Sequence, residues 1–391
     1  MPKLINQAPF PNFRYYSLDN SGHEFGIIIV KATYAIAPSG GLLVAEEQAP
    51  MIFTDKCHGA VNVTSLWHPS DLVPNKPRTD IIINAIARSP GGRPQRDWTC
   101  GIKIETAEGA VVVNKELRVT GPRFWRPKWR VALNEKQKQD WRKHRHAFKA
   151  WELSEPEPIT ELPLHYEYAY GGLLQRGLDH NGKPIMATDH RNPLGRGWID
   201  PEFTDLTIPQ PAPQIELASE PITDPYHKYI PQGLGPIPPA WLPRRPLGGT
   251  FDDEWNANVW PNWPSDYSFA YNNSAHPDLI CPDYLNGNER IVLLNLFAGI
   301  PELRLNLPGD RMSIEFVRAD DSVEKKDMNL DTVFLDIASS EHGDCHVFLS
   351  WRVNFVVDQF KNAIIRYIPT NQLSARTPAH PRTQLLKRTS A

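Results

Sequence analysis

Proline sets the strongest limits on how this chain can fold. The sequence has 38 prolines in 391 residues, close to twice the usual share of about 5%. Each proline fixes φ and removes a backbone donor, so long helices are largely excluded and short strands with long irregular connections are expected. Because 40% of the residues are hydrophobic and 22% are charged, the composition is that of a globular protein rather than a disordered one.

The prolines are concentrated between residues 153 and 288. Segments such as Pro209–Pro213 and Pro231–Pro246 cannot form regular secondary structure. The same region is rich in large aromatic residues, namely Tyr226, Tyr229, Trp241, Phe251, Trp255, Trp260, Trp263, Tyr267, Phe269 and Tyr271. A flexible linker is polar, so this much aromatic surface predicts long ordered loops that pack over a sheet, and such loops often carry function.

Strand-like segments flank the proline-rich region on both sides. In the first half they are Phe25–Ile36, Thr79–Ala87, Thr99–Thr106, Ala110–Val113 and Glu116–Thr120. In the second half they are Glu289–Ala298, Glu302–Leu307, Arg311–Val317, Asp331–Ile337 and Cys345–Val357. Turn signals recur about every 8–12 residues, which favours a sandwich or open barrel over an α/β fold.

We therefore predict a mainly β fold with few short helices. Two antiparallel β-sandwich-like layers or subdomains would be joined by long ordered loops rich in proline and aromatic residues. The predicted division is an N-terminal β-domain with one basic helix (1–152), the loop region (153–288), a C-terminal β-region (289–369) and a disordered polar tail (370–391).

The segment from Asn134 to Trp151 predicts a helix, because it lacks proline and glycine and because Asn134 with Gln137 resembles a capping box. At helical spacing one face carries Trp141, His144, Phe148 and Trp151. The other faces carry Lys136, Lys138, Arg142, Lys143, Arg145 and Lys149. Such a basic face is either simply solvated or a docking surface for an acidic partner or nucleic acid.

Charge and cysteine content limit the classes of protein that need to be considered. The formal net charge is −3, so no global field favours nucleic acid or an anionic membrane. The apolar runs have the length of strands, and a membrane span of about 20 apolar residues is not expected. The cysteines Cys57, Cys100, Cys281 and Cys345 are far apart, which predicts reduced thiols and a cytoplasmic protein.

The sequence lacks the common catalytic signatures: a phosphate-binding loop, a dinucleotide-binding loop, a nucleophile elbow and the zinc-protease helix. His342–His346 contains side chains that bind metals, but neighbouring residues of a strand point to opposite faces. We therefore expect neither a cofactor nor enzymatic activity. The alternative is a carbohydrate-active enzyme or glycan-binding protein that uses Asp252, Asp253, Glu254 and Asp266, which lie among tryptophans.

Five loop-like stretches stand out by their proline, glycine, arginine and aromatic residues. They are Asp71–Asp80, Val119–Trp125, Leu162–Gly172, Asn192–Trp198 and Trp241–Arg245, the last continuing through Gly249–Asp252 to Trp255. In this order they resemble a bacterial family of unknown function found beside spike-protein genes of type VI secretion systems. The resemblance covers about residues 10–360, and the basic segment 134–151 looks like a variable addition to it.

The resemblance implies a non-catalytic adaptor or chaperone. Such a protein binds a secreted effector with a PAAR or PAAR-like domain and aids its loading on the VgrG spike. The expected partners are that effector and VgrG, with no nucleic acid and no membrane, and no cofactor or catalytic residue comes with the resemblance. A nucleic-acid binder that uses the basic helix and tail is a second alternative.

For partner contact we predict loop arginines and tryptophans, because these residue types dominate interface energetics. They are Trp67, Arg78, Arg123, Trp125, Arg196, Trp198, Arg244 and Trp255, with Trp198 the first candidate for a core residue instead. Rigid proline loops would present them as a preformed groove that covers apolar or strand-edge surface on an unassembled effector.

Overall fold

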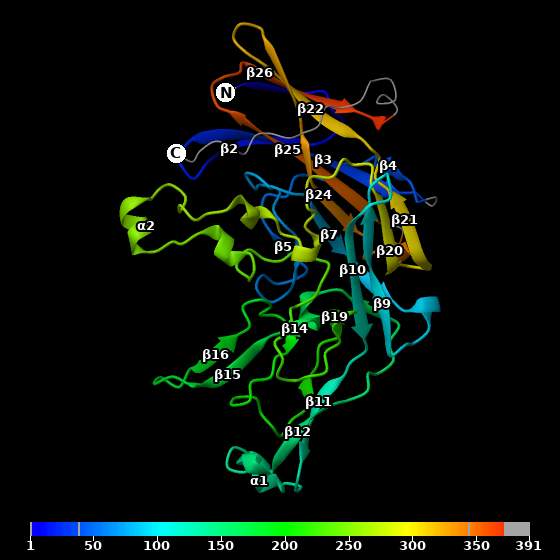
Figure 1. Ribbon diagram of the computed structural model, residues 1–391, viewed down its shortest axis with the longest axis vertical. Helices are drawn as coiled ribbons and strands as arrows, with labels where there is room; N and C mark the ends of the chain where they lie inside the picture. The colour runs from blue at the N-terminus through cyan, green and yellow to red at the C-terminus, as the bar shows by residue number, and fades with distance from the viewer. Residues whose placement is uncertain (1, 38–39, 343–344, 371–391) are drawn as a thin grey trace.

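The computed structural model describes residues 2–37, 40–342 and 345–370. It confirms the mainly β prediction, with 42% strand and 9% helix. The molecule is elongated, with the larger sheets in its upper half and a smaller lobe at the lower end (Figure 1). The tail from residue 371 onward, predicted to be disordered, lies outside the described residues.

The largest sheet has six strands and joins the two ends of the sequence. Its order is β2 (Asn12–Leu18), β3 (Glu24–Ile36), β25 (His346–Val356), β24 (Asn329–Asp336) and β7 (Asp80–Asn84), with β4 (Leu42–Val44) also on β3. β3 pairs antiparallel with β25 along its whole length, and Val30 lies opposite Trp351. β7 pairs parallel with β24, so the sheet is mixed rather than purely antiparallel.

Two further sheets complete the upper half. One has the order β19 (Ile215–Leu217), β10 (Val111–Thr120), β9 (Asp97–Glu105), β20 (Arg290–Phe297) and β21 (Ile300–Asn306). The other has the order β1 (Lys3–Asn6), β26 (Asn362–Ile368), β22 (Arg311–Val317) and β23 (Val323–Asp327). All three sheets contribute to one buried cluster, for example through Val30, Ile104 and Ile314. Strands from residues 1–152 and 289–369 therefore share sheets and one core.

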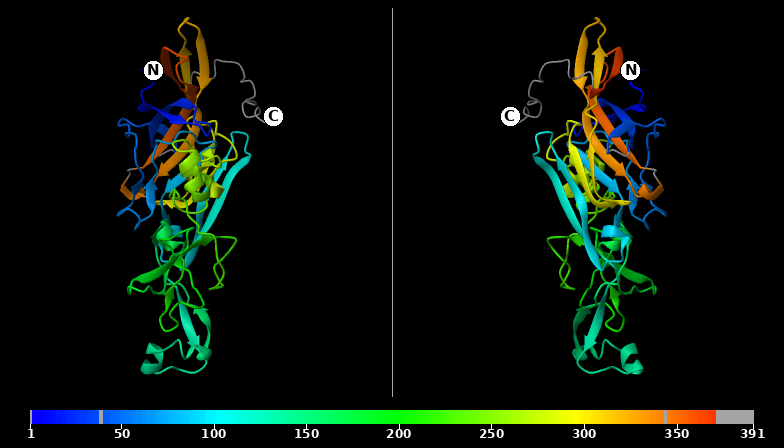
Figure 2. Two further views of the ribbon diagram at one scale, coloured as in Figure 1. Left: turned by 90° about the vertical axis from the view of Figure 1, so that its left-hand side faces the viewer. Right: turned by 90° about the vertical axis from the view of Figure 1, so that its right-hand side faces the viewer.

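The lower lobe has its own small sheet and its own core (Figures 1 and 2). The sheet has the order β12 (Phe148–Leu153), β11 (Phe124–Trp129) and β18 (Gln210–Pro211). Its core is a separate cluster of Trp125, Trp141, Trp151, Tyr170, Ile199, Leu206, Ala212, Ile222 and Tyr229. Part of the proline-rich region thus packs into a second core at a distance from the large sheets.

The other regular elements are short, as the proline content predicts. Two-stranded pairs are β5 (Lys56–Cys57) with β6 (Leu66–His68), β8 (Ile86–Arg88) with β13 (Glu161–Pro163), β14 (Tyr170–Gly171) with β17 (Arg196–Gly197), and β15 (Leu173–Leu178) with β16 (Pro184–Thr188). The 3-10 turns η1 to η7 are Pro90–Gly92, Arg145–Ala147, Tyr166–Tyr168, Arg245–Gly248, Phe269–Asn272, Pro277–Leu279 and Ser340–His342.

The helix predicted over Asn134–Trp151 is wrong beyond its first turn. α1 spans only Glu135–Gln139, a 3-10 turn follows, and Phe148 already begins β12. The predicted capping box is confirmed, because Asn134 and Gln137 each accept the other's backbone N–H at 2.9 Å. Tertiary structure overrides the helical spacing, since β12 pairs with β11 and places Trp151 in the lobe core. The second α-helix, α2, spans Asp253–Asn258.

The predicted strands fall close to observed ones. Phe25–Ile36 corresponds to β3, Thr99–Thr106 to β9, and Cys345–Val357 to β25. Cys57, Cys100 and Cys281 are free thiols. Among the described residues, no helix is long and apolar enough to cross a membrane.

Candidate functional site

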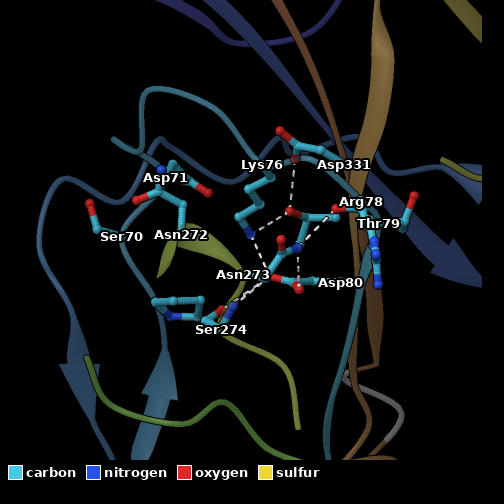
Figure 3. A network of polar contacts seen from close by, with 12 residues as sticks. Ser70, Asp71, Lys76, Arg78, Thr79, Asp80, Asn272, Asn273, Ser274 and Asp331 are labelled. Carbon is cyan, nitrogen blue, oxygen red and sulfur yellow. Dashed lines mark hydrogen bonds and ion pairs between the residues drawn. The ribbon is translucent and has the colours of Figure 1, made fainter. Parts of the chain in front are cut away.

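The stretch Asp71–Asp80 runs into the interior and ends in a buried polar network (Figure 3). The carboxylate of Asp80 accepts hydrogen bonds from Lys76 Nζ at 2.9 Å, Asn273 Nδ2 at 2.8 Å and the backbone N–H of Ser274 at 2.8 Å. Lys76 also donates to Thr332 on β24 at 2.9 Å. The network therefore fastens the start of β7 and the loop before it to residues 273–274 and to the neighbouring strand β24.

A second buried ion pair lies beside it. Lys31 Nζ on β3 is 3.0 Å from the carboxylate of Asp71 and 3.2 Å from Nε2 of His68. His68 donates through Nδ1 to the carbonyl of Pro69 at 2.7 Å, so its Nε2 is free to accept from the ammonium group. Burial and the nearby Lys31 charge lower the pKa of His68 to about 4. Burial likewise lowers the pKa of Lys31, an effect that Asp71 opposes.

A third buried pair closes the cluster. Arg352 Nε on β25 donates to Asp331 at 2.6 Å, and its Nη1 donates to Tyr15 and to the carbonyl of Asp71. Among these groups lies a cavity of about 10 Å³, lined by Lys31, His68, Asp71, Lys76 and Arg352. That volume suits about one water molecule and no larger ligand. The charges are paired inside the protein, which makes this cluster a structural clamp.

The motifs that carry the family resemblance also hold one another. The side chain of Asn192 donates to the carbonyls of Tyr166 and Tyr170 at 2.8 and 3.0 Å. Arg196 donates to the carbonyl of Glu167 at 2.7 Å and lies over the ring of Tyr168. The carboxylate of Glu167 in turn accepts from the backbone N–H of Ser65 at 2.8 Å.

The fifth motif is fixed in the same way. The ring of Trp241 packs edge-on against Tyr166, with centroids 5.6 Å apart. Arg244 is 8% exposed and donates to the carbonyls of Ile237 and Tyr271 at 2.5 and 2.9 Å. Ile237 and Tyr271 lie outside the strands, so a side-chain donor satisfies their carbonyl groups instead of a ladder hydrogen bond.

Another ionic clamp joins the lobe to the upper half. The carboxylate of Glu216 on β19 accepts from Arg123 at 2.6 Å and from Arg118 at 2.5 Å. The carbonyl of Pro213, three residues earlier, accepts from Arg123 at 3.0 Å. Arg196 donates to Gln214 on the same segment at 3.2 Å. The predicted residues Arg123 and Arg196 are thus brought together, on either side of residues 213–216.

The structure brings Arg123 and Arg196 to the same segment and Trp125 and Trp198 to the lobe core, while the other four predicted contact residues lie in other parts of the fold. Arg123, Trp125 and Arg244 are buried, so a partner that docks on the folded chain meets little of these side chains. Trp198 packs against the lobe core, in line with the reservation made for it. Partner contact by the whole set stays a prediction.

The remaining predicted residues lie nearer the surface. Trp67 is half-buried and donates to Asp336 at 3.3 Å, and Trp255 donates to the carbonyl of Asn262 at 3.0 Å. Arg78 is the exposed member of the set. Its backbone carbonyl accepts from Asn273 at 2.9 Å, which ties this exposed residue to the buried network.

The acidic residues among the tryptophans hold turns. Asp252 caps α2 by accepting from the backbone N–H of Trp255 at 2.8 Å. Asp266 accepts from the backbone and side chain of Thr250, and these hydrogen bonds lower its pKa.

The larger hollow described lies between the η1 turn and the turn from β20 to β21. Its volume is about 560 Å³, and its lining includes Arg88, Gly91, Glu161, Phe297 and Gly299. Arg88 and Glu161 form an ion pair of 3.0 Å at its wall. Across the described residues, no group of three or more histidine, cysteine, aspartate or glutamate side chains has a metal-binding arrangement.

The ribbon of β15 and β16 (Leu173–Thr188) is an exposed apolar element that was not predicted from the sequence. Leu173, Leu178, Ile185 and Met186 are each about half exposed, at 53, 59, 48 and 49%. Within the described chain, β15 and β16 pair only with each other. The sequence does carry a signal for it, because Asn181-Gly182 between two apolar runs is a strong hairpin motif.

One comparison with known proteins gave a match. Residues 21–352 match the model of a family described as an uncharacterized protein conserved in bacteria (DUF2169). No curated protein and no solved structure matches the chain.

Proposed function

The chain belongs to the bacterial family DUF2169, and from that premise we propose that it is a non-catalytic adaptor or chaperone for a type VI secretion effector. The effector would carry a PAAR or PAAR-like domain, and the adaptor would aid its loading on the VgrG spike. The support for this partner is the resemblance of the five loop motifs described above. The support for a binding role is the exposed ribbon.

The ribbon of β15 and β16 is the observation that carries the proposal. Residues directly opposite each other on two strands share a face of the ribbon. Gln175 lies opposite Met186, and Leu178 lies opposite Pro184, so the apolar side chains of Leu173, Leu178, Pro184 and Met186 share one face with the polar side chains of Gln175 and Thr188. An isolated two-stranded ribbon is marginally stable in water unless a further strand or a packing surface covers it.

The ribbon therefore suits strand addition by a partner. Its unpaired backbone groups form a template for an extended segment, and its apolar face adds side-chain contacts. Before the effector reaches the spike, this pairing would cover an exposed strand edge that otherwise aggregates. The buried clamps hold the surrounding loops in place, which lowers the ordering cost of binding.

Affinity purification of the tagged full-length chain from its native host, followed by mass spectrometry, tests the proposal. A PAAR-bearing or spike-associated protein should co-purify in stoichiometric amount. The amount of this partner that co-purifies should fall at least about tenfold in the double variant Leu178→Ser/Met186→Ser, because each serine removes apolar contact area.

The matched control is Val61→Ser/Val63→Ser, which removes two exposed apolar side chains elsewhere, at 70 and 65% exposure. This control should retain the partner. A chain that elutes alone while the secretion system is expressed would contradict the adaptor function. Equal retention by both double variants would contradict the role of the ribbon.

A further inference from the structure

The lower end of the molecule is strongly basic. Residues 124–153, here called the basic end, contain nine lysines and arginines and three acidic residues, a net charge of +6. The whole chain has a net charge of −3, so the rest of the sequence carries −9. β11, β12 and α1 place this charge at the tip of the lobe (Figures 1 and 2).

The fold displays these side chains outward. Arg126, Lys128 and Arg130 alternate with Trp125, Pro127 and Trp129, and all three basic residues are exposed. Side chains two residues apart point to the same face of a strand, so this face carries one basic residue about every 6.6 Å. Lys136, Lys138, Arg142, Lys143 and Lys149 are exposed around the tip.

The acidic residues of the basic end do not neutralise it. Glu152, Glu135 and Asp140 pair with Lys128, Lys138 and Lys143 at 3.2, 2.7 and 2.5 Å. Six basic residues remain without an acidic side-chain partner in the part of the chain that the structure describes: Arg126, Arg130, Lys136, Arg142, Arg145 and Lys149. Arg145 is half-buried and donates to the carbonyl of Glu202, whereas the other five are exposed, so their charge is available to an external anion.

The tryptophans of the basic end face inward. Trp125, Trp141 and Trp151 are 2, 7 and 7% exposed and form the lobe core, and Trp129 packs against that core. They hold the basic strands rigidly and leave no exposed tryptophan on which a nucleic-acid base could stack. A long polyanion would also pass the negatively charged remainder of the chain, whereas a compact acidic patch on a folded protein contacts the tip alone.

We propose that the basic end docks an acidic surface of the protein partner. This inference rests on the proposed function, because it takes the partner to be a protein. It adds a second, ionic contact to the strand pairing at the ribbon. The basic end and the ribbon both lie in the lower half of Figure 1, so one partner can meet both. Charge attraction at this tip would speed the encounter and set the orientation before the ribbon pairs.

A fluorescent polyglutamate peptide of about 8 residues, short enough to contact the tip alone, serves as the probe, and its fluorescence anisotropy with the full chain is measured. We expect binding at about 50 mM salt that weakens by at least about tenfold at 200 mM, because ionic contacts are screened. The variant Arg126→Gln/Lys128→Gln/Arg130→Gln should bind at least about tenfold more weakly. Its thermal unfolding should match that of the parent, since all three side chains are exposed.

The control variant is Arg93→Gln/Arg290→Gln/Lys325→Gln, which makes the same change in net charge at exposed positions outside the basic end. It should bind the peptide as the parent does. Equal weakening by both variants, or no binding at low salt, would overturn the inference. The same assay is repeated with a DNA duplex and with phosphatidylserine vesicles. Binding to either that is tighter than binding to the peptide, and that is lost in Arg126→Gln/Lys128→Gln/Arg130→Gln, would overturn the inference in favour of that anion.

Failure here is distinct from failure of the adaptor function. The ribbon variants Leu178→Ser/Met186→Ser leave every residue of the basic end in place, and the peptide probe needs no effector. If the effector co-purifies with the parent but the peptide binds all variants equally, the acidic contact is wrong and the adaptor function stands.

Discussion

At the scale of single residues, the protein uses buried charge to hold loops that proline keeps out of regular structure. Lys76 with Asp80, Lys31 with Asp71, and Arg352 with Asp331 are all almost fully enclosed. A buried pair is costly to desolvate, but removing one partner is worse because the other charge is left alone. These pairs therefore fix geometry more than they add stability.

Asp80→Asn should lower the free energy of unfolding by about 3–5 kcal/mol, because the buried Lys76 ammonium group loses its counterion. Urea unfolding monitored by tryptophan fluorescence measures the change. The matched control is Glu152→Gln, which breaks the exposed pair with Lys128 and should change the value by less than about 1 kcal/mol. Similar losses in the two variants would show that the Asp80 network is not a clamp.

Stability should fall as the pH drops below the ordinary histidine range. The pKa of His68 is about 4 in the folded protein and 6.5 when unperturbed, so the unfolded chain takes up a proton first. The contribution of His68 is present above pH 6.5 and is lost as the pH falls towards about 4, at about 1.4 kcal/mol per pH unit.

Denaturant unfolding at about pH 7 and about pH 5 checks this. The loss between the two should be about 2 kcal/mol smaller in His68→Gln than in the parent. Other buried histidines, such as His276, titrate in the same direction, and comparison with the variant separates them from His68. An equal loss in both proteins would mean that His68 is not held neutral.

The residue types at the clamps were visible in the sequence, but their partners were not. Lys76 and Asp80 are four residues apart and were grouped within one distinctive motif. Asn273 and Thr332, which complete their network, are about 200 and 250 residues away. Arg123 and Trp125 have the side chains of typical interface anchors, an arginine and a tryptophan. The same two side chains also fill closed pockets between a protein's own loops, so the sequence does not distinguish the two roles.

At the scale of elements, close backbone approach fixes how the upper sheets meet the lobe. Gly121 links β10 to β11, and a Cβ at this position would lie 1.7 Å from the carbonyl oxygen of Glu157. The loop that contains Glu157 can lie this close to Gly121 only because glycine has no side chain. The turn between the two parts of the molecule therefore depends on one glycine.

Gly121→Ala should destabilise the protein by about 2 kcal/mol, through displacement of that loop. Thermal unfolding followed by circular dichroism measures the change. Gly235→Ala is the matched control, because its added Cβ would meet only the Leu66 carbonyl oxygen at 3.9 Å. If the two variants unfold at the same temperature, the contact with Glu157 does not constrain the turn.

Strands were predicted well where apolar residues form long runs in the sequence. They were predicted poorly where contacts with distant parts of the chain determine the secondary structure. β3 and β25 carry long apolar runs that form strands in most contexts. The segment 134–151 has helical spacing, yet β11 offers it a strand partner and the lobe core takes its tryptophans. The ribbon was missed although Asn181-Gly182 signals its turn, because its flanking runs are short.

At the scale of the whole molecule, two separate cores should unfold as separate units. Trp125→Ala removes a large side chain from the centre of the lobe core and should cost the lobe about 3–5 kcal/mol. The three upper sheets share a different cluster and should keep their protection. Hydrogen exchange should therefore quicken in β11, β12 and residues 199–229 but not in β3 or β25.

Trp260→Ala provides the control, because this tryptophan is 66% exposed and lies outside both clusters. It should leave exchange unchanged in both halves. Faster exchange throughout the molecule in Trp125→Ala would mean that lobe and sheets form one cooperative unit.

The pairing of β3 with β25 has a consequence for how the chain is made. A ribosome adds roughly 5–20 residues per second, so roughly 15–60 s separate the synthesis of these two strands. During that time Ile27–Val30, fully buried in the finished sheet, has no β25 to cover it. The nascent chain must therefore keep this apolar strand from aggregating until β25 has emerged.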